Sequence, residues 1–223
     1  MSKLYVTGTP IGNLEDITLR ALRIFKEVDT ILCEDTRVTK KLLSHYDIHT
    51  KTMSYHAQSK LSKIDTIIGL LEEGKDLALV SDAGTPTISD PGSLLVSEIR
   101  KRLPETEIVA VPGASAVVSA LSIAGVPTND FIFLGFLPHK KGRETLFKEI
   151  SETKRTVVFY ESPHRILKTL NSLIKFAPEK KVSLAREITK MYEEVLQGTA
   201  QELLEKLEND TQKQRGEFVV IVS

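Results

Sequence analysis

Short apolar segments alternate with helical segments from the start of the chain. KLYVTG is a brief apolar strand that breaks into the turn TGTPIGN. In DITLRALRIFKEV, apolar residues recur at helical spacing from Ile17 to Val28, which predicts a helix with an inward stripe and Asp16 as N-cap. DTILCED then has no polar face as far as Cys33, as expected for a strand that is covered on both sides. These are βα units, which imply a parallel sheet with helices on its faces.

The alternation continues to the end of the chain. Further helices are predicted over about residues 36–44, 60–73 and 145–151 and in DPGSLLVSEIRKRL, ASAVVSALSIAG, PHRILKTLNSLIK and QELLEKLEN. Further strands are predicted over about residues 52–55 and in DLALV, EIVAVPG, FIFLGFLP, TVVFYES, KVSLARE and GEFVVIVS. Two helix starts combine a cap with a proline at the first position, Asp90 with Pro91 and Ser162 with Pro163. The composition becomes more aromatic and more basic from Asp130, so we predict two domains, 1–115 and 116–223.

Composition restricts the classes of protein that this chain can belong to. With 223 residues it is long enough for one large domain or two small ones, and it has no long apolar run that would span a membrane. Thirty basic residues balance thirty acidic ones, so nucleic acid would have to be bound by a local basic face. The N-terminus lacks the features of a secretory signal, and the lone Cys33 reads as a buried thiol. We expect a cytoplasmic protein.

Four turns follow strands of the predicted parallel sheet, where ligands of such sheets bind: TGTPIGN, CEDTR, SDAGTP and VPGASA. Their small residues let backbone groups approach a ligand, and Asp82 or Glu34 can accept hydrogen bonds from ribose or amine donors. Each turn taken alone also fits an ordinary βα connection. The dinucleotide pattern GxGxxG is absent, since Pro10 interrupts the first turn, and so is the phosphate-binding GxxxxGK[ST].

Two other motifs carry residues that are common in catalytic and metal sites. His45 and His49 lie four apart, but they flank a turn and lack an obvious third ligand, so we predict no metal. FYESPHR offers Glu161, His164 and Arg165 as catalytic groups, while its Ser-Pro pair also fits a helix start.

Eight ordered motifs cover nearly the whole chain: TPIGNLEDITLRAL, EDTR, SYHAQS, LVSDAGTPTISDPG, VPGASAVVSALSIAGVPT, GFLPHKKGR, FYESPHR and AREITKMYEEVLQGT. With them the sequence resembles the tetrapyrrole methylase superfamily, in the branch that methylates a cytidine 2′-hydroxyl of 16S ribosomal RNA. The resemblance implies two α/β domains, the first with a mostly parallel sheet and helices on both faces and the second with a mixed sheet. It also implies S-adenosylmethionine in the cleft between them, ribosomal RNA or the small ribosomal subunit as partner, and a homodimer.

The resemblance also implies site residues. Cofactor contacts are expected at Pro10, Asp82, Ala83, Gly84, Thr85, Pro86, Gly113, Ser115, Ala116, Leu134, Tyr160, Ala185 and Gly216. A carboxylate and backbone carbonyls there would favour the cationic sulfonium.

Methyl transfer needs in-line positioning of the acceptor oxygen and a base for the hydroxyl proton. Asp35 is the first candidate for the base, followed by Glu34 and Glu187. The residues expected to act on phosphate or RNA are Arg37, Arg165, Arg186, Lys190 and the HKKGR residues Lys140, Lys141 and Arg143. Structural ion pairs across the domain interface are the alternative for the acids and arginines, and solvated loop charge is the alternative for HKKGR.

Two departures from the superfamily pattern matter. Members that act on porphyrins and corrins have GxGPG in the first turn, whereas this chain has GTPIG, which favours the ribosomal branch. Ribosomal members often continue into a small C-terminal segment thought to grip RNA, while this sequence stops at Ser223; we expect cofactor binding without that segment. A same-fold methyltransferase acting on a tetrapyrrole or another small molecule, and a non-catalytic RNA-binding assembly factor, remain as alternatives.

Overall fold

The chain forms two compact units, Met1–Ser115 and Ala116–Ser223. The computed structural model describes residues 2–56, 61–90 and 92–223. The domain limits 1–115 and 116–223 stay a prediction, and the two compact units have the same limits. The end of the SYHAQS motif, the predicted helix start at Lys60 and the predicted role of Pro91 lie outside the described residues.

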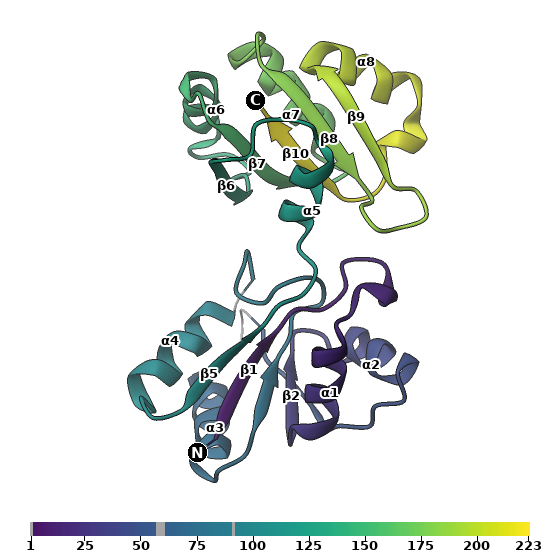
Figure 1. Cartoon of the computed structure of the whole chain (residues 1–223). Coiled ribbons are helices and arrows are strands. Elements are labelled where there is room, and N and C mark those ends of the chain that lie inside the picture. The colour runs from purple at the N-terminus through teal and green to yellow at the C-terminus, as the bar shows by residue number, and fades with distance from the viewer. Residues whose placement is uncertain (1, 57–60, 91) are drawn as a thin grey trace. The chain divides into compact units, whose positions relative to one another are not determined.

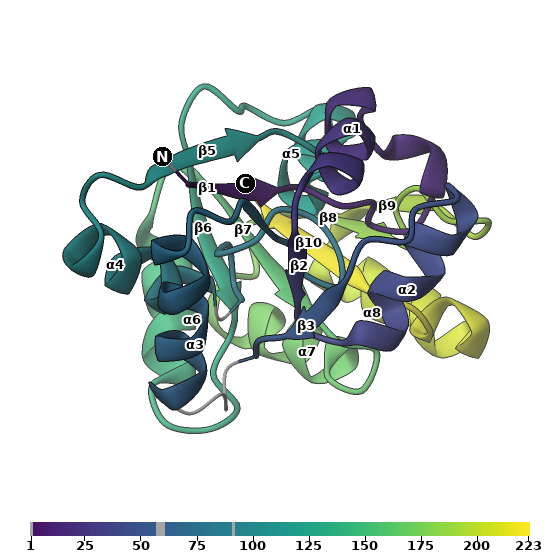
Figure 2. The ribbon, with the colours of Figure 1, turned by 90° about the horizontal axis from the view of Figure 1, so that it is seen from below.

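The first unit is built on a five-stranded parallel sheet of order β3-β2-β4-β1-β5. Its elements are β1 (Lys3–Thr7), a short 3-10 helix η1 (Leu14–Asp16), α1 (Leu19–Glu27), β2 (Thr30–Cys33), α2 (Thr36–His45), β3 (Thr52–Ser54), α3 (Leu61–Glu72), β4 (Leu77–Leu79), α4 (Gly92–Arg102) and β5 (Glu107–Val111). Helices α1 and α2 lie on one face of the sheet and α3 and α4 on the other, as Figures 1 and 2 show. The predicted parallel sheet with helices on both faces is confirmed.

Alternate strand residues of this sheet fill two separate cores. Ile31 and Cys33 pack under α1 and α2, whereas Leu32, between them, packs under α3 and α4. This is why β2 reads as a continuous apolar run in the sequence. The Cys33 thiol is fully buried, as predicted.

The predicted N-cap of α1 is wrong. Asp16 ends η1, and Thr18 caps α1 instead, with its hydroxyl accepting the Ala21 backbone N–H at 3.1 Å. Ile17 and Thr18 are extended, so the helix begins later than the apolar spacing suggested.

The second unit has a mixed sheet of order β6-β7-β10-β8-β9, in which only β6 and β7 are parallel. Its elements are α5 (Ala116–Ile123), β6 (Phe131–Phe136), α6 (Arg143–Glu152), β7 (Thr156–Glu161), α7 (Ile166–Phe176), β8 (Lys181–Arg186), β9 (Glu194–Thr199), α8 (Ala200–Asn209), a 3-10 helix η2 (Thr211–Gln214) and β10 (Phe218–Val222). Helices α6, α7 and α8 share one large core with the sheet, and α5 packs against β10. The predicted mixed sheet is confirmed.

Two details of the second unit differ from expectation. Strand β9 was not predicted, because it is a partly exposed edge strand that pairs only with β8. Helix α7 begins at Ile166, so Ser162 is not its N-cap; the Ser162 carbonyl instead accepts the N–H groups of Arg165 and Ile166 in a preceding turn. Within the described ranges, no helix has the length and apolar character needed to cross a membrane.

Candidate functional site

The strand order of the first unit places a ligand-binding edge at the carboxyl ends of β1 and β4. The connection from β1 leads past β4 to β2, and the connection from β4 leads past β1 to β5, so the two leave in opposite directions. Ligands of open parallel sheets bind outside the strand ends at such a switch in order. The turns that begin at Gly8 and Ser81 therefore flank the candidate site.

Hydrogen bonds lock three of the four predicted turns into one assembly. Thr9 and Gly84 exchange backbone hydrogen bonds of 2.9 and 3.1 Å, and the Thr9 hydroxyl donates to the Ser81 carbonyl at 3.1 Å. The Thr85 hydroxyl donates to the carbonyl of Ala114 at 3.3 Å, which ties in the turn after β5. Gly84 has a φ of +78°, a conformation that favours glycine. These hydrogen bonds therefore position the predicted cofactor residues of the three turns, which are Pro10, residues 82–86, Gly113 and Ser115.

The turns after β1 and β5 touch through two glycines. A Cβ added to Gly113 would lie 2.8 Å from the Gly8 backbone, and one added to Gly8 would meet Gly113 at the same distance. Contact of Gly113 with a cofactor stays a prediction, but this close approach is an independent reason for a glycine there. Sequence reasoning missed Gly8, although its place directly after a strand was a usable signal.

Alanine at Gly113 is expected to destabilise the first unit by about 1–3 kcal/mol, because the added methyl group overpacks two backbones. Gly69 in α3 is the matched control, since a Cβ there meets nothing within 4 Å. Gly69→Ala should stabilise by about 1 kcal/mol through helix propensity. Thermal unfolding followed by circular dichroism measures both changes. Equal unfolding temperatures for the two variants would show that the glycine contact is not needed.

The turn after β2 carries two acids with different environments. Asp35 caps α2 by accepting the Arg37 N–H at 2.8 Å, and it pairs with the Arg37 guanidinium at 2.6 Å. The hydrogen bond from the Arg37 side chain is the main reason why the pKa of Asp35 falls to about 2. Burial, followed by the charges of Asp82 and Asp90, raises the pKa of Glu34. The Asp35 N–H also donates to Asp82 at 3.0 Å, which joins this turn to the assembly.

Two cavities adjoin the turn after β4, and both are lined by Ser81. The smaller one lies between Glu34, Tyr55 and Asp90. The larger one, here called the α2 pocket, is formed by the segment after β1, the α2 residues from Val38 to Leu42 and the turn at 81–83.

In the second unit, two predicted cofactor residues share one row of the sheet. Tyr160 of β7 and Ala185 of β8 both pair with Val219 of β10. Burial raises the pKa of Tyr160, and a hydrogen bond with the Val117 backbone acts in the opposite direction. The side chain of Leu134 packs against the core that the sheet shares with α6, α7 and α8. Ala116 is the first residue of α5.

Gly216 and Glu187 are packed together. Gly216 has a φ of +92°, and a Cβ there would lie 2.7 Å from the Glu187 carboxyl carbon. Glu187 also has a positive φ and accepts the Glu217 N–H at 2.9 Å. Burial alone would raise the pKa of Glu187, but hydrogen bonds from Lys190 and the Glu217 backbone outweigh it and lower the pKa. Glu187 and Lys190 form an ion pair within the second unit, and the alternative of ion pairs across the domain interface stays a prediction.

Two predicted phosphate clamps, Arg186 and Arg165, and Arg143 of the predicted HKKGR cluster are held inside the second unit. Arg186 donates to three backbone carbonyls. Arg165 pairs with the buried Glu161 at 2.7 Å, and the Arg143 side chain is only 6% exposed. We therefore leave these three arginines out of the proposed RNA contacts.

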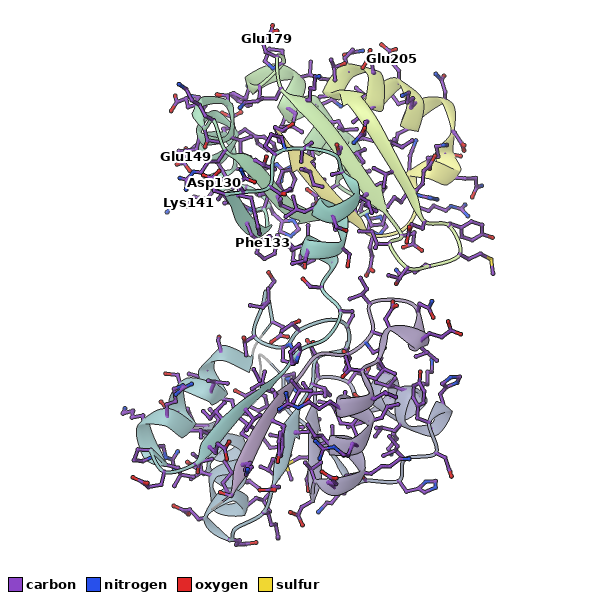
Figure 3. All side chains as sticks on the ribbon, viewed as in Figure 1. Asp130, Phe133, Lys141, Glu149, Glu179 and Glu205 are labelled. Carbon is purple, nitrogen blue, oxygen red and sulfur yellow. The ribbon has the colours of Figure 1, made fainter. Side chains whose placement is uncertain are left out.

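Lys140 and Lys141 remain exposed, and Lys141 lies at the outer edge of the second unit in Figure 3.

His49, which was weighed as a metal ligand, pairs with Asp47 at 3.0 Å at the surface. The described part of the chain holds no group of three or more His, Cys, Asp or Glu residues that could bind a metal ion.

Comparison with known proteins agrees with this architecture. Residues 3–204 match the tetrapyrrole (corrin/porphyrin) methylases. A relative from Halalkalibacterium halodurans named ribosomal RNA small subunit methyltransferase I is 49% identical over 98% of this chain and 75% of its own length. A relative of the same name from Thermotoga maritima is 45% identical over 100% of this chain and 99% of its own length.

Solved structures show the same fold at low identity. Cobalt precorrin-4 methyltransferase is 18% identical with a TM-score of 0.70, covering 98% of this chain and 94% of its own. Uroporphyrin-III C-methyltransferase from Thermus thermophilus, complexed with S-adenyl homocysteine, is 16% identical with a TM-score of 0.66, covering 100% of this chain and 97% of its own. The chain therefore belongs to the tetrapyrrole (corrin/porphyrin) methylase family, alongside the ribosomal RNA small subunit methyltransferase I proteins.

Proposed function

We propose that the protein is an S-adenosylmethionine-dependent ribosomal RNA methyltransferase that transfers a methyl group to the 2′-hydroxyl of a cytidine in 16S ribosomal RNA. The observation that carries the proposal is the identity of 45–49% over at least 98% of the chain with relatives named for ribosomal RNA methylation. The cobalt precorrin-4 and uroporphyrin-III methyltransferase structures share 18% and 20% identity with this chain and support the fold alone.

The assembly of turns suits the sulfonium of the cofactor. It presents the exposed carboxylate of Asp82 at one edge of the sheet, whereas the carbonyls of Ser81 and Gly84 accept hydrogen bonds from Thr9 within the assembly. A carboxylate attracts a cation, whereas a loop built for phosphate would expose N–H groups and basic side chains. The predicted cofactor contacts in both units remain part of the proposal, as do a homodimer and a cytoplasmic location.

The reaction needs a group that accepts the proton of the ribose hydroxyl. Glu34 fits this role better than Asp35, because its pKa is raised while that of Asp35 is about 2. A general base is most effective when its pKa lies closer to the working pH. We therefore place Glu34 ahead of Asp35 as the base, and we assign Asp35 and Arg37 to the structure of the α2 start.

Calorimetry and methyl transfer test the proposal together. We expect S-adenosylmethionine to bind with a dissociation constant at or below the micromolar range, about −8 kcal/mol. Tritium from the labelled cofactor should appear in small ribosomal subunits and not in uroporphyrinogen, and nuclease mapping should place it on a cytidine ribose. Binding without transfer to RNA would favour a non-catalytic assembly factor, and transfer to uroporphyrinogen would favour tetrapyrrole chemistry.

A further inference from the structure

The α2 pocket has an apolar wall whose residues are not among the proposed cofactor contacts. Ile11 and Leu14 line one side, and Val38 and Leu42 of α2 line the other. Val38 is 40% exposed and Leu14 is 37% exposed, so the wall is open to solvent on one side. An open apolar wall of this kind suits a flat ring better than a charged group.

The two walls are tied to each other. The Tyr46 hydroxyl, directly after α2, donates to the Leu14 carbonyl at 2.6 Å. Asn13 accepts the Glu15 N–H at 3.1 Å and so fixes the short helix η1 that carries Leu14. These two hydrogen bonds hold Leu14 in place beside α2. The fold therefore fixes the shape of the pocket, although the segment after β1 contains only the short 3-10 helix η1.

The rim of the pocket is basic. Lys41 lines the pocket and Lys40 lies beside it on α2, and both are exposed. Neither lysine forms an ion pair with any residue in 2–56, 61–90 or 92–223. Helix α2 itself, TRVTKKLLSH, carries no acidic residue, and Asp82 is the carboxylate that lines the pocket at its other end, in the turn after β4.

We propose that the α2 pocket and its two lysines bind an unpaired nucleotide of the substrate RNA, next to the nucleotide that is methylated. The base stacks on the apolar wall between Val38 and Leu14, and the phosphates on either side of it contact Lys40 and Lys41. Single-stranded RNA is commonly bound by stacking of its bases on aromatic side chains together with neutralisation of its backbone. Here aliphatic side chains would take the place of the aromatic ring. The proposal rests on the proposed function and describes how the protein binds its RNA substrate.

The pocket also holds three of the proposed cofactor contacts, Pro10, Asp82 and Ala83. We place the cofactor at these residues and the nucleotide at the wall of Leu14 and Val38, beside the two lysines, whose charges would repel the sulfonium. The same Ser81 that lines the α2 pocket also lines the cavity of Glu34. An RNA strand that passes over the turn at 81–83 can therefore place one nucleotide in the pocket and the next toward Glu34.

Two variants of the full chain test the proposal, each with a matched control in the same unit. Val38→Glu puts a negative charge on the apolar wall, and Leu94→Glu, at an exposed leucine of α4, is its control. Lys40→Glu with Lys41→Glu reverses the rim charge, and Arg100→Glu with Lys101→Glu makes the same change on α4. Binding is measured with a fluorescent single-stranded RNA oligonucleotide that carries the target sequence, and transfer with small ribosomal subunits.

Both pocket variants should weaken RNA binding roughly tenfold or more, and the double lysine variant should lower the salt slope by about 2. The controls should bind RNA as the unaltered protein does, and all four should keep the calorimetric affinity for S-adenosylmethionine. Pocket variants that bind RNA normally, or that lose the cofactor in parallel with RNA, would overturn the proposal. If the unaltered protein transfers no methyl group to RNA, the proposed function itself fails, which is a separate outcome.

Discussion

Replacing Glu34 with glutamine is expected to reduce methyl transfer by about 10²- to 10⁴-fold, the usual contribution of a general base. Glutamine keeps the size of the side chain but cannot take the proton from the ribose hydroxyl. Glu34 lies outside the cofactor contacts proposed here, so the calorimetric affinity for S-adenosylmethionine should not change. The measurement is the single-turnover rate of tritium transfer to small ribosomal subunits.

The same variant should be more stable than the unaltered protein at neutral pH. Burial and the charges of Asp82 and Asp90 raise the pKa of Glu34 above its ordinary value of 4.5, so the folded state disfavours the ionised form. A raised pKa in the folded state lowers stability as pH rises above the ordinary value. Glu34→Gln should therefore unfold at a higher temperature at pH 7, and the difference should vanish near pH 4.

Asp35→Asn separates the two candidate bases. With a pKa of about 2, Asp35 is ionised at every pH where the reaction is measured, but it is a weak base. Its replacement removes the pairing with Arg37 and weakens the cap of α2, so we expect a much smaller loss of turnover than with Glu34→Gln. A larger loss with Asp35→Asn would return Asp35 to the position of base that the sequence first suggested. The acid limb of the rate should reflect a pKa above 4.5 only if Glu34 is the base.

The periodicity of apolar residues was sufficient to predict the first sheet. Ile31, Leu32 and Cys33 read as an uninterrupted apolar run because the two faces of β2 pack into separate cores. Strand β9 lacked such a signal, since an edge strand that pairs on one side needs little apolar surface. The start of α1 depended on backbone angles at Ile17 and Thr18 that spacing does not encode.

The sequence was sufficient to predict which turns form the candidate site. It did not predict which residues of these turns contact one another. Glycines and prolines after strands indicated where the chain approaches a ligand, but the bridge between Thr9 and Gly84 joins residues 75 positions apart. The Tyr46 bond to Leu14 is of the same kind, because nothing local in either segment indicates the other. Charge in the sequence was also ambiguous: Arg143 stands beside Lys140 and Lys141 in HKKGR, yet the fold buries the arginine and leaves the lysines exposed.

That arginine belongs to a buried network centred on Glu161, which is only 1% exposed. The Glu161 carboxylate accepts hydrogen bonds from the Thr169 hydroxyl at 2.6 Å and the Ser162 N–H at 2.9 Å, and it pairs with Arg165 at 2.7 Å. Arg143 joins through Thr169 at 2.7 Å. The two guanidinium groups donate to the carbonyls of residues 137 and 138, so the network anchors the segment that leads to the exposed lysines.

Glu161→Gln should destabilise the second unit by about 3–5 kcal/mol, because it leaves two buried guanidinium groups with no carboxylate in the network. The matched control is Glu144→Gln, which breaks an exposed pair with Lys175 at 3.3 Å and should cost at most about 1 kcal/mol. Urea unfolding, with hydrogen exchange of the β7 and β10 amides to report on this unit alone, measures both. Equal losses in the two variants would mean that Arg143 and Arg165 find other compensation, and that the segment carrying Lys140 and Lys141 is not held by Glu161.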